Sequence, residues 1–436
     1  MCKNFGFASD GPIEAYLRTS SRLVSLDALR GFDMFWILGA DALIEAFGKM
    51  QAAPSVHKPL QFFAVQMEHV DWVGLHFYDL IFPLFIFIVG ASLVFSLTKM
   101  IKQHGRRSAV RRILVRSALL ILLGIIYNGG LSQEWPNVRL SGVLQRIGLS
   151  YAAAALLFCF CKPRMLVVAF VVLLLGYWAL LTFAPIRDVK LDRKPIEDPS
   201  IASYLETGDV NRTLSSSDKE IARQKIVASY YVETRRRIGG YEAGLNVVNH
   251  FDFEHLPGRL HFDYYDAEGV LSTVPAIATA LLGVLAGLWL RRSDMGEGRR
   301  VVGLCIAGVI ALGLGYLWSL QFPIIKLLWT SSYVLVTGGW SLLLLAGFYY
   351  LIDVRRWHAW SLPFVWIGMN AITLYLLVNF VSFRGLSQRL VGGSVSSFFD
   401  RTVAVGFGDV MMMAVRLALV ILLAHFLYQR KIFLKV

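Results

Sequence analysis

The chain has 436 residues, of which 56% are hydrophobic and 17% charged, and its mean hydropathy is +0.56. The apolar residues gather in long runs rather than at amphipathic spacing, which excludes a soluble globular domain and indicates a polytopic helical membrane protein. The formal net charge of +13 comes without a nucleic-acid-binding motif, so basic loops at a membrane surface explain it better than a nucleic-acid partner does.

Ten apolar runs approach the ~20 residues that a helix needs to cross a bilayer. They cover residues 32–47, 78–98, 113–127, 142–161, 165–183, 270–290, 301–320, 333–352, 362–383 and 405–428. The fold prediction is therefore an all-α integral membrane protein with about ten transmembrane helices and one long outer, periplasmic loop.

Basic residues predict the orientation, because short loops rich in Lys and Arg stay in the cytoplasm. They gather at positions 99–116, 162–164, 291–300, 355–356 and 430–435, all on one face of the ten-helix arrangement. The predicted organisation is a cytoplasmic N-terminal segment (1–25), helices 1–5 (26–184), a periplasmic loop (185–269), helices 6–10 (270–428) and a cytoplasmic tail (429–436). We expect a bacterial inner membrane protein with both termini cytoplasmic, whose basic loops attract anionic lipid headgroups.

One histidine needs an explanation. His69 lies just ahead of the second apolar run, and ionisable groups at the edge of the bilayer core are costly and usually face a cavity or a pathway. A metal site is not expected, because His250, His255 and His261 in the outer loop match no zinc-ligand spacing.

Seven short motifs occur between residues 22 and 370. They are RLVSLDALRG (22–31), HVDWVGL (69–75), DLIFPLFIFIVGAS (79–92), GVLQRIG (142–148), EGVLST (268–273), LWTSSY (328–333) and GMN (368–370). Each is weak alone, but together and in this order the chain resembles heparan-alpha-glucosaminide N-acetyltransferase and its bacterial relatives.

The resemblance implies an enzyme that takes acetyl-CoA from the cytoplasm and transfers the acetyl group across the membrane to the amine of a glucosamine residue. It implies that His69 is catalytic. The family's partner asparagine corresponds to Asp41 here, a departure that would favour a protonated imidazole if the two side chains touch. A second departure is the sequence Asp-Ala-Glu-Gly at 266–269, where the family has Asp-Pro-Glu-Gly.

Further roles are suggested by polar residues that lie in or beside the apolar runs and the motifs. The acceptor sugar would be bound by Asp79, Trp72, Asp266, Glu268 and Asn370, and acetyl-CoA by Arg30, Gln145, Arg146 and Arg112. Three of these have alternatives: Asp79 as a helix cap, Arg30 as a snorkelling helix-end residue, and Arg146 as one half of a structural ion pair with Glu134 or another carboxylate. The expected partners are the amino sugar, acetyl-CoA and membrane lipid, with a homodimer left open and no nucleic acid.

The chemistry itself requires a base, because an amine must be deprotonated before it attacks a thioester. His69 fits that role, and it also fits the role of a nucleophile that carries the acetyl group covalently. Two other functions stay open: an amino-sugar transporter for compounds such as N-acetylglucosamine, and an O-acetyltransferase of an envelope polysaccharide.

Overall fold

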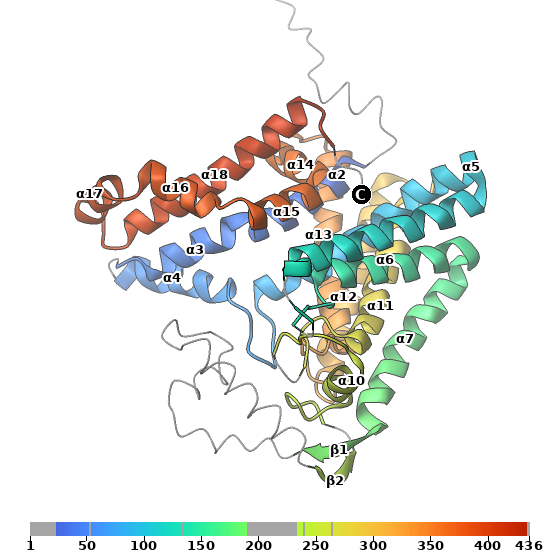
Figure 1. Ribbon diagram of the computed structural model, residues 1–436. Coiled ribbons are helices and arrows are strands. Elements are labelled where there is room, and N and C mark those ends of the chain that lie inside the picture. The colour runs from blue at the N-terminus through green and yellow to red at the C-terminus, as the bar shows by residue number, and fades with distance from the viewer. Residues whose placement is uncertain are drawn as a thin grey trace, which may run out of the picture.

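The computed structural model describes residues 23–51, 54–132, 134–135, 137–189, 233–238, 240–262 and 265–433. The predicted N-terminal segment 1–25 therefore lies outside the described residues except for its last three, and so does the middle of the predicted outer loop, residues 190–232. Figure 1 shows that the described chain is built of helices, with one small pair of strands at the lower end. The protein is an all-α membrane protein, as predicted.

The long apolar helices form the body of the molecule. They are α5 (Ile81–Tyr127), α6 (Val143–Phe160), α7 (Pro163–Phe183), α11 (Val270–Leu290), α12 (Glu297–Trp318), α13 (Ser331–Phe348) and α18 (Phe407–Gln429). Among the described residues, seven helices are long and apolar enough to cross a membrane, or eight if one bent pair counts as a span. The predicted count of ten stays a prediction.

The shorter elements complete the fold. They are α2 (Val24–Phe35), α3 (Asp41–Lys49), α4 (Pro54–Gln66), α10 (Val247–His255), α14 (Leu362–Met369), α15 (Ala371–Phe380), α16 (Phe383–Val391), α17 (Ser394–Thr402), and the strands β1 (Pro185–Val189) and β2 (Glu233–Ile238). The two strands pair antiparallel. The predicted outer loop 185–269 thus contains a strand pair and a helix.

Two glycines and one asparagine shape four of the predicted spans in ways that the apolar pattern does not show. The first run, 32–47, is split into α2, a π-helical turn η1 (Trp36–Ala40) and α3, because Gly39 adopts a φ of 134°. The ninth run breaks at Asn370, where the two flanking helices are bent by 68°. The second and third runs both belong to α5, which Gly105 interrupts with a φ of 76°.

Small residues let α5 and α11 pack closely. A Cβ atom on Gly90 would lie 2.0 Å from the carbonyl oxygen of Ala280, and one on Gly283 would lie 2.0 Å from that of Phe87. Such contacts between small residues are typical of helices that associate in a membrane. They place α5, which carries much of the site, in the centre of the molecule.

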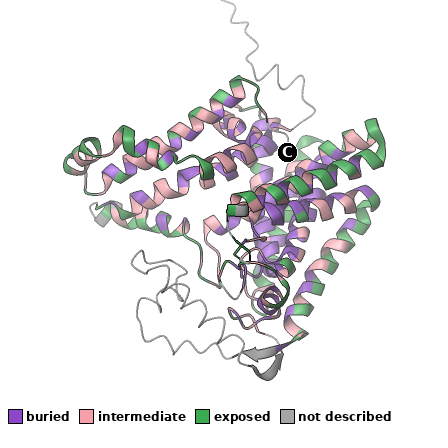
Figure 2. Ribbon diagram, viewed as in Figure 1, coloured by how far each residue is buried: buried purple, intermediate pink, exposed green. Residues whose placement is uncertain are grey.

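Figure 2 shows buried residues gathered in the middle of the molecule and exposed ones along outer helices such as α7. The exposed side chains on α7 and α12 are largely apolar and include Val168, Val172, Val309 and Leu317. An exposed apolar surface of this kind suits lipid rather than water.

Candidate functional site

The loop that carries His69 is held by one buried carboxylate. Asp79, in the 3-10 turn η2 (Phe77–Leu80), is 1% exposed, and its Oδ1 lies 2.8 Å from Nδ1 of His69. Its Oδ2 accepts hydrogen bonds from the backbone N–H groups of Val70 and His76, at 3.3 and 3.1 Å. Asp79 therefore caps the turn, one of its two predicted alternatives, and also orients the histidine.

A lysine that the sequence did not predict completes this group. Nζ of Lys326, from the turn ahead of α13, lies 3.0 Å from Oδ1 of Asp79, and 2.8 and 3.2 Å from the two ring nitrogens of His69. Burial lowers the pKa of Lys326, against the opposing pull of the Asp79 carboxylate. The sequence signal that could have found it is a cation two residues ahead of the motif at 328–333. We call His69, Asp79 and Lys326 the histidine triad.

The triad lies at a small, mostly apolar cavity of about 190 Å³. Its polar lining comes from His69, Lys326, Tyr78 and Glu268, and the apolar lining comes from α2, α5, α6 and α15. The His69 side chain is 54% exposed, so a ligand can reach its ring. We call this cavity the histidine pocket.

Two acidic residues of the loop before α11 are bound by Arg139, and one of them lines the histidine pocket. Glu268 lines it and accepts a 2.6 Å hydrogen bond from Arg139. Asp266 is fully buried and is bound by Nε and Nη2 of Arg139 at 3.2 and 2.9 Å. Burial alone would raise the pKa of Asp266, but these bonds hold it below its ordinary value. Glu268 is thus presented to the cavity, while Asp266 anchors the loop.

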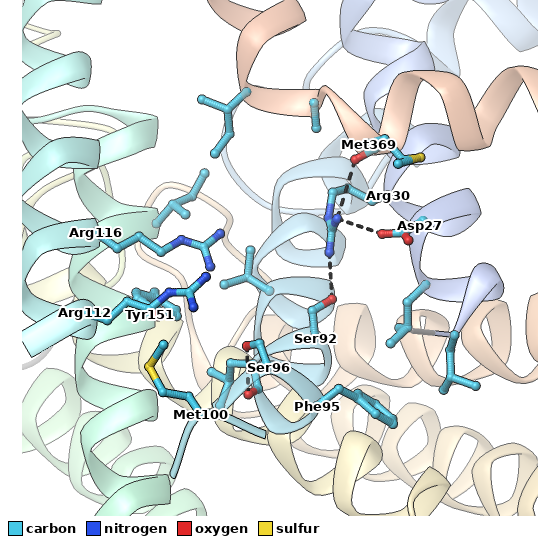
Figure 3. Close-up of a pocket in the computed structure, with 18 of the residues that line it drawn as sticks. Asp27, Arg30, Ser92, Phe95, Ser96, Met100, Arg112, Arg116, Tyr151 and Met369 are labelled. Atoms are coloured by element: carbon cyan, nitrogen blue, oxygen red, sulfur yellow. Dashed lines mark hydrogen bonds and ion pairs between the residues drawn. The ribbon is translucent and has the colours of Figure 1, made fainter. Parts of the chain in front are cut away.

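A second, larger cavity of about 460 Å³ is strongly basic. Figure 3 shows Arg112 and Arg116 extending into it from one helix and Arg30 from another. Arg30 is fixed by Asp27 at 3.1 Å and by Oγ of Ser92 at 2.7 Å. We call this the basic cavity. It contains the predicted Arg30 and Arg112, together with Arg116 at the end of the basic segment 99–116.

The two cavities share part of their lining. Phe85, Ile147, Ala371 and Ile372 line both the histidine pocket and the basic cavity. These residues form an apolar wall, and α15 begins in it directly after the break at Asn370. A group bound in one cavity is therefore separated from the other by side chains alone.

Two curated proteins are similar to this chain in sequence. No protein-family model matches the chain. The human heparan-alpha-glucosaminide N-acetyltransferase is 28% identical over 412 residues, which cover 85% of this chain and 56% of the human protein. The mouse enzyme of the same name is 27% identical over 418 residues, with the same coverage of both chains.

The chain is related to these N-acetyltransferases at the family level. The predicted resemblance is thereby confirmed. The chain spans slightly more than half the length of the curated relatives it matches, 56% in both.

The predicted contact between Asp41 and His69 is replaced by an indirect one. Tyr78 donates a 2.8 Å hydrogen bond to Oδ2 of Asp41, and the Tyr78 ring lies 4.9 Å from the His69 ring, centroid to centroid. The carboxylate that meets the histidine is that of Asp79. Because the helix breaks at Gly39, Asp41 begins a separate helix, α3, and reaches the site through Tyr78.

Two residues predicted to bind acetyl-CoA do not line the basic cavity. Arg146 is buried and donates to the carbonyl of Ala267 at 3.1 Å and to Oγ of Ser272. Its guanidinium lies 4.8 Å from the centre of the Trp329 ring. Arg146 therefore joins α6 to the start of α11, and Gln145, its neighbour, lines a different cavity described below.

Two residues predicted to bind the acceptor are placed elsewhere. Asn370 lines the basic cavity, and its side-chain amide is buried without a hydrogen-bond partner among the described residues. The Trp72 indole N–H donates to the carbonyl of Tyr241 at 2.6 Å, so Trp72 ties the histidine loop to the segment before α10. Within the described part of the chain, no group of three or more His, Cys, Asp or Glu could hold a metal ion.

Proposed function

We propose that this protein is a membrane acetyltransferase that moves an acetyl group from acetyl-CoA to the amine of a glucosamine-type sugar. The observation that carries the proposal is the histidine triad beside the basic cavity, with one apolar wall between them. The family-level relationship to named N-acetyltransferases supports it.

The basic cavity fits the donor. Arg30, Arg112 and Arg116 would bind the phosphates of CoA, because guanidinium groups pair with phosphate through two hydrogen bonds at once. On the part of α5 before Gly105, the residues that line the basic cavity run from Phe85 to His104. This part of the helix is about 28 Å long at 1.5 Å per residue. An extended donor could lie along this part of the helix, with its phosphates at the basic end and its acetyl group at the wall. Asn370 is placed to meet the amide groups of the donor near the wall.

The histidine triad fits a general base. An ionised carboxylate can only accept, so the 2.8 Å contact with Asp79 puts the proton of His69 on Nδ1. Nε2, which Nζ of Lys326 approaches at 3.2 Å, is then the nitrogen that would accept the proton of the substrate. The Lys326 ammonium, 3.0 Å from Oδ1 of Asp79, balances the charge of this carboxylate.

The reaction then needs one proton to move from nitrogen to sulfur. His69 accepts the proton of the sugar amine as the amine nitrogen bonds to the acetyl carbon. The C–S bond breaks, and the imidazolium returns the proton to the leaving thiolate. A covalent route, in which Nε2 first takes the acetyl group and then passes it to the amine, uses the same residues and stays an alternative.

The positions of the basic residues support one orientation of the reaction across the membrane. The segment of α5 around the break at Gly105 is basic and contains Lys99, Lys102, Arg106 and Arg107. These charges favour a cytoplasmic position for the basic cavity. The histidine pocket would then open to the periplasm of a bacterial inner membrane. The homodimer and the contacts with anionic lipid stay predictions.

Acetyl transfer by the purified full chain tests the proposal. With acetyl-CoA and glucosamine we expect N-acetylglucosamine, and with His69→Ala we expect at least a ~10³-fold loss of turnover with CoA binding kept. Unchanged turnover in this variant would contradict the role of His69. If glucose were acetylated as fast as glucosamine, the protein would be an O-acetyltransferase.

An amino-sugar transporter is the second candidate, and the broken helices favour it. Discontinuous helices line the substrate sites of many transporters, and here the helices break at Gly39 and at Asn370. Uptake of labelled N-acetylglucosamine into proteoliposomes without acetyl-CoA would support transport. Uptake that requires acetyl-CoA, or none at all, would support the acetyltransferase.

A further inference from the structure

A third cavity of about 220 Å³ adjoins the histidine pocket. It is lined by the end of α5, the start of α6, Arg139, the loop residues His261 and Glu268, and Tyr375 of α15. Val143, Leu144, Glu268 and Tyr375 line both cavities. We call this third cavity the side chamber.

We propose that the side chamber binds the ring of the acceptor sugar, while the amine of that sugar reaches past Glu268 into the histidine pocket. This rests on the proposed function in one respect, since it takes an amino sugar as the acceptor. What it adds is a defined ring site that selects a hydroxylated six-membered ring over a simple amine.

An unpartnered amide is the first observation. Gln145 lines the side chamber and is 5% exposed, and neither atom of its amide group has a hydrogen-bond partner among the described residues. Buried polar groups are almost always paired, and an amide offers two donors and an acceptor. Sugar hydroxyls, which both donate and accept, would satisfy all of these.

Glycine makes room for this amide. A Cβ atom on Gly124 would lie 2.1 Å from Oε1 of Gln145, and one on Gly142 would lie 2.8 Å from the same atom. Any larger residue at either position would force the amide to move. The backbone around Gln145 is therefore shaped to keep its amide in the lining of the side chamber.

An aromatic surface is the second observation. Tyr127 and Tyr375 both line the side chamber, and their rings are stacked with centroids 4.7 Å apart and planes 11° apart. An aromatic face can cover the CH groups of a sugar ring while amides and carboxylates take its hydroxyls. Both components are present in one cavity.

The charged and titratable groups fit a neutral ring with one basic amine. Glu268 lines both cavities, so its carboxylate can bind an incoming ammonium group at the entrance to the histidine pocket. Burial and the nearby Arg139 lower the pKa of His261. Its ring is therefore neutral near pH 7 and can both donate to and accept from hydroxyls.

The size of the side chamber fits one ring. A cavity of about 150 Å³ is large enough to take up benzene. At about 220 Å³, the side chamber has room for a single six-membered ring with its hydroxyl groups and no more. The acceptor would thus be held by a terminal sugar, with the rest of any longer glycan outside.

Sugar binding without acetyl-CoA tests the proposal. Calorimetry on the full chain in detergent would compare glucosamine with cyclohexylamine, an amine on a six-membered ring without hydroxyls. We expect glucosamine to bind at least tenfold more tightly, and Gln145→Leu to weaken glucosamine binding about tenfold. The matched control is Ser150→Ala, because Ser150 is also buried on α6 but does not line the side chamber; it should bind glucosamine as the wild type does.

Each outcome separates this inference from the proposed function. Equal binding of both amines, no glucosamine binding, or unchanged binding in Gln145→Leu would overturn the ring site, even if acetyl transfer is observed. Glucosamine binding that depends on Gln145 without any acetyl transfer would keep the ring site and overturn the proposed function. If Gln145→Leu does not fold, Tyr375→Leu carries the same test, because Tyr375 is only partly buried and forms the aromatic surface.

Discussion

The basic cavity and the histidine pocket handle charge in opposite ways. In the basic cavity, Arg112 and Arg116 add to Arg30, and among the described residues of its lining the only carboxylate is that of Asp27, already bound to Arg30. In the histidine pocket, Asp79 and Lys326 neutralise each other across His69. The first cavity is built to attract an anion, whereas the second lets a proton move without leaving an isolated charge.

The largest effect should come from breaking the balance in the histidine pocket at its carboxylate. Asp79→Asn removes the charge that holds the proton on Nδ1 of His69 and that pairs with Lys326. We expect kcat for acetyl transfer to fall about 10²- to 10⁴-fold, with acetyl-CoA affinity unchanged.

Asp71→Asn is the matched control, since Asp71 is an exposed carboxylate two residues from His69. Steady-state kinetics and equilibrium CoA binding would be measured on both variants. Equal losses in the two would show that the effect is not specific to the triad.

A smaller effect should come from the cation of the same pocket. Burial lowers the pKa of Lys326, so its ammonium is lost at a lower pH than that of an ordinary lysine, and above that pH the Asp79 charge is no longer balanced. The wild-type rate should therefore decline on the alkaline side, below the ordinary lysine value of 10.5.

Lys326→Met should lower kcat about 10- to 100-fold and remove the alkaline decline, whereas Lys326→Arg should restore part of the rate. An alkaline decline that persists in Lys326→Met would assign it to another group.

The basic cavity can be tested separately from the chemistry. Arg112→Gln and Arg116→Gln should each raise the KM for acetyl-CoA about tenfold, because each removes a charge-assisted bond to phosphate. Acetyl-pantetheine carries the thioester but none of the phosphates of CoA, so the KM for acetyl-pantetheine should not change in these variants. Arg107→Gln, on the same helix but exposed and outside the cavity, is the control. An equal rise in the KM for acetyl-CoA and for acetyl-pantetheine would show that these arginines do not bind the phosphates of CoA.

The same contrast explains what could be predicted from the sequence. Arg30 and Arg112 are cations beside long apolar runs, and their cost in a membrane is visible without a structure. The triad is not visible in this way, because Lys326 is 257 residues from His69 and lies within another apolar stretch. The partner of Arg146 was equally hidden, since the sequence shows that a buried arginine needs a partner but not that the partner is the loop carbonyl of Ala267.

The positions at which helices break could not be predicted from the sequence either. The apolar pattern at 32–47 and 362–383 reads as continuous helix, and hydropathy carries no information on backbone angles. The φ of 134° at Gly39 and the bend of 68° around Asn370 decide that Asp41 meets Tyr78 and that Asn370 faces the basic cavity. The contacts of residues next to such breaks, Asp41 and Asn370, could therefore not be predicted from the apolar runs.

The smallest effect should come from a buried carboxyl group outside both cavities. Asp252 of α10 is fully buried and accepts a 2.9 Å hydrogen bond from the backbone N–H of Val270, at the start of α11. Burial raises the pKa of Asp252 to about 7, although the Val270 bond opposes the shift. The folded protein therefore holds a proton between the ordinary value of 3.8 and about 7 that the unfolded chain releases, so stability should fall as pH rises through this window. Apparent unfolding temperatures at pH 5 and pH 8 should differ by a few degrees in the wild type, with the higher value at pH 5, and less in Asp252→Asn.

Acetyl transfer should change less than twofold, since Asp252 touches neither the triad nor the basic cavity. A large loss of activity would extend the acceptor side of the enzyme to α10, whereas an unchanged pH slope would assign the stored proton to another carboxyl group.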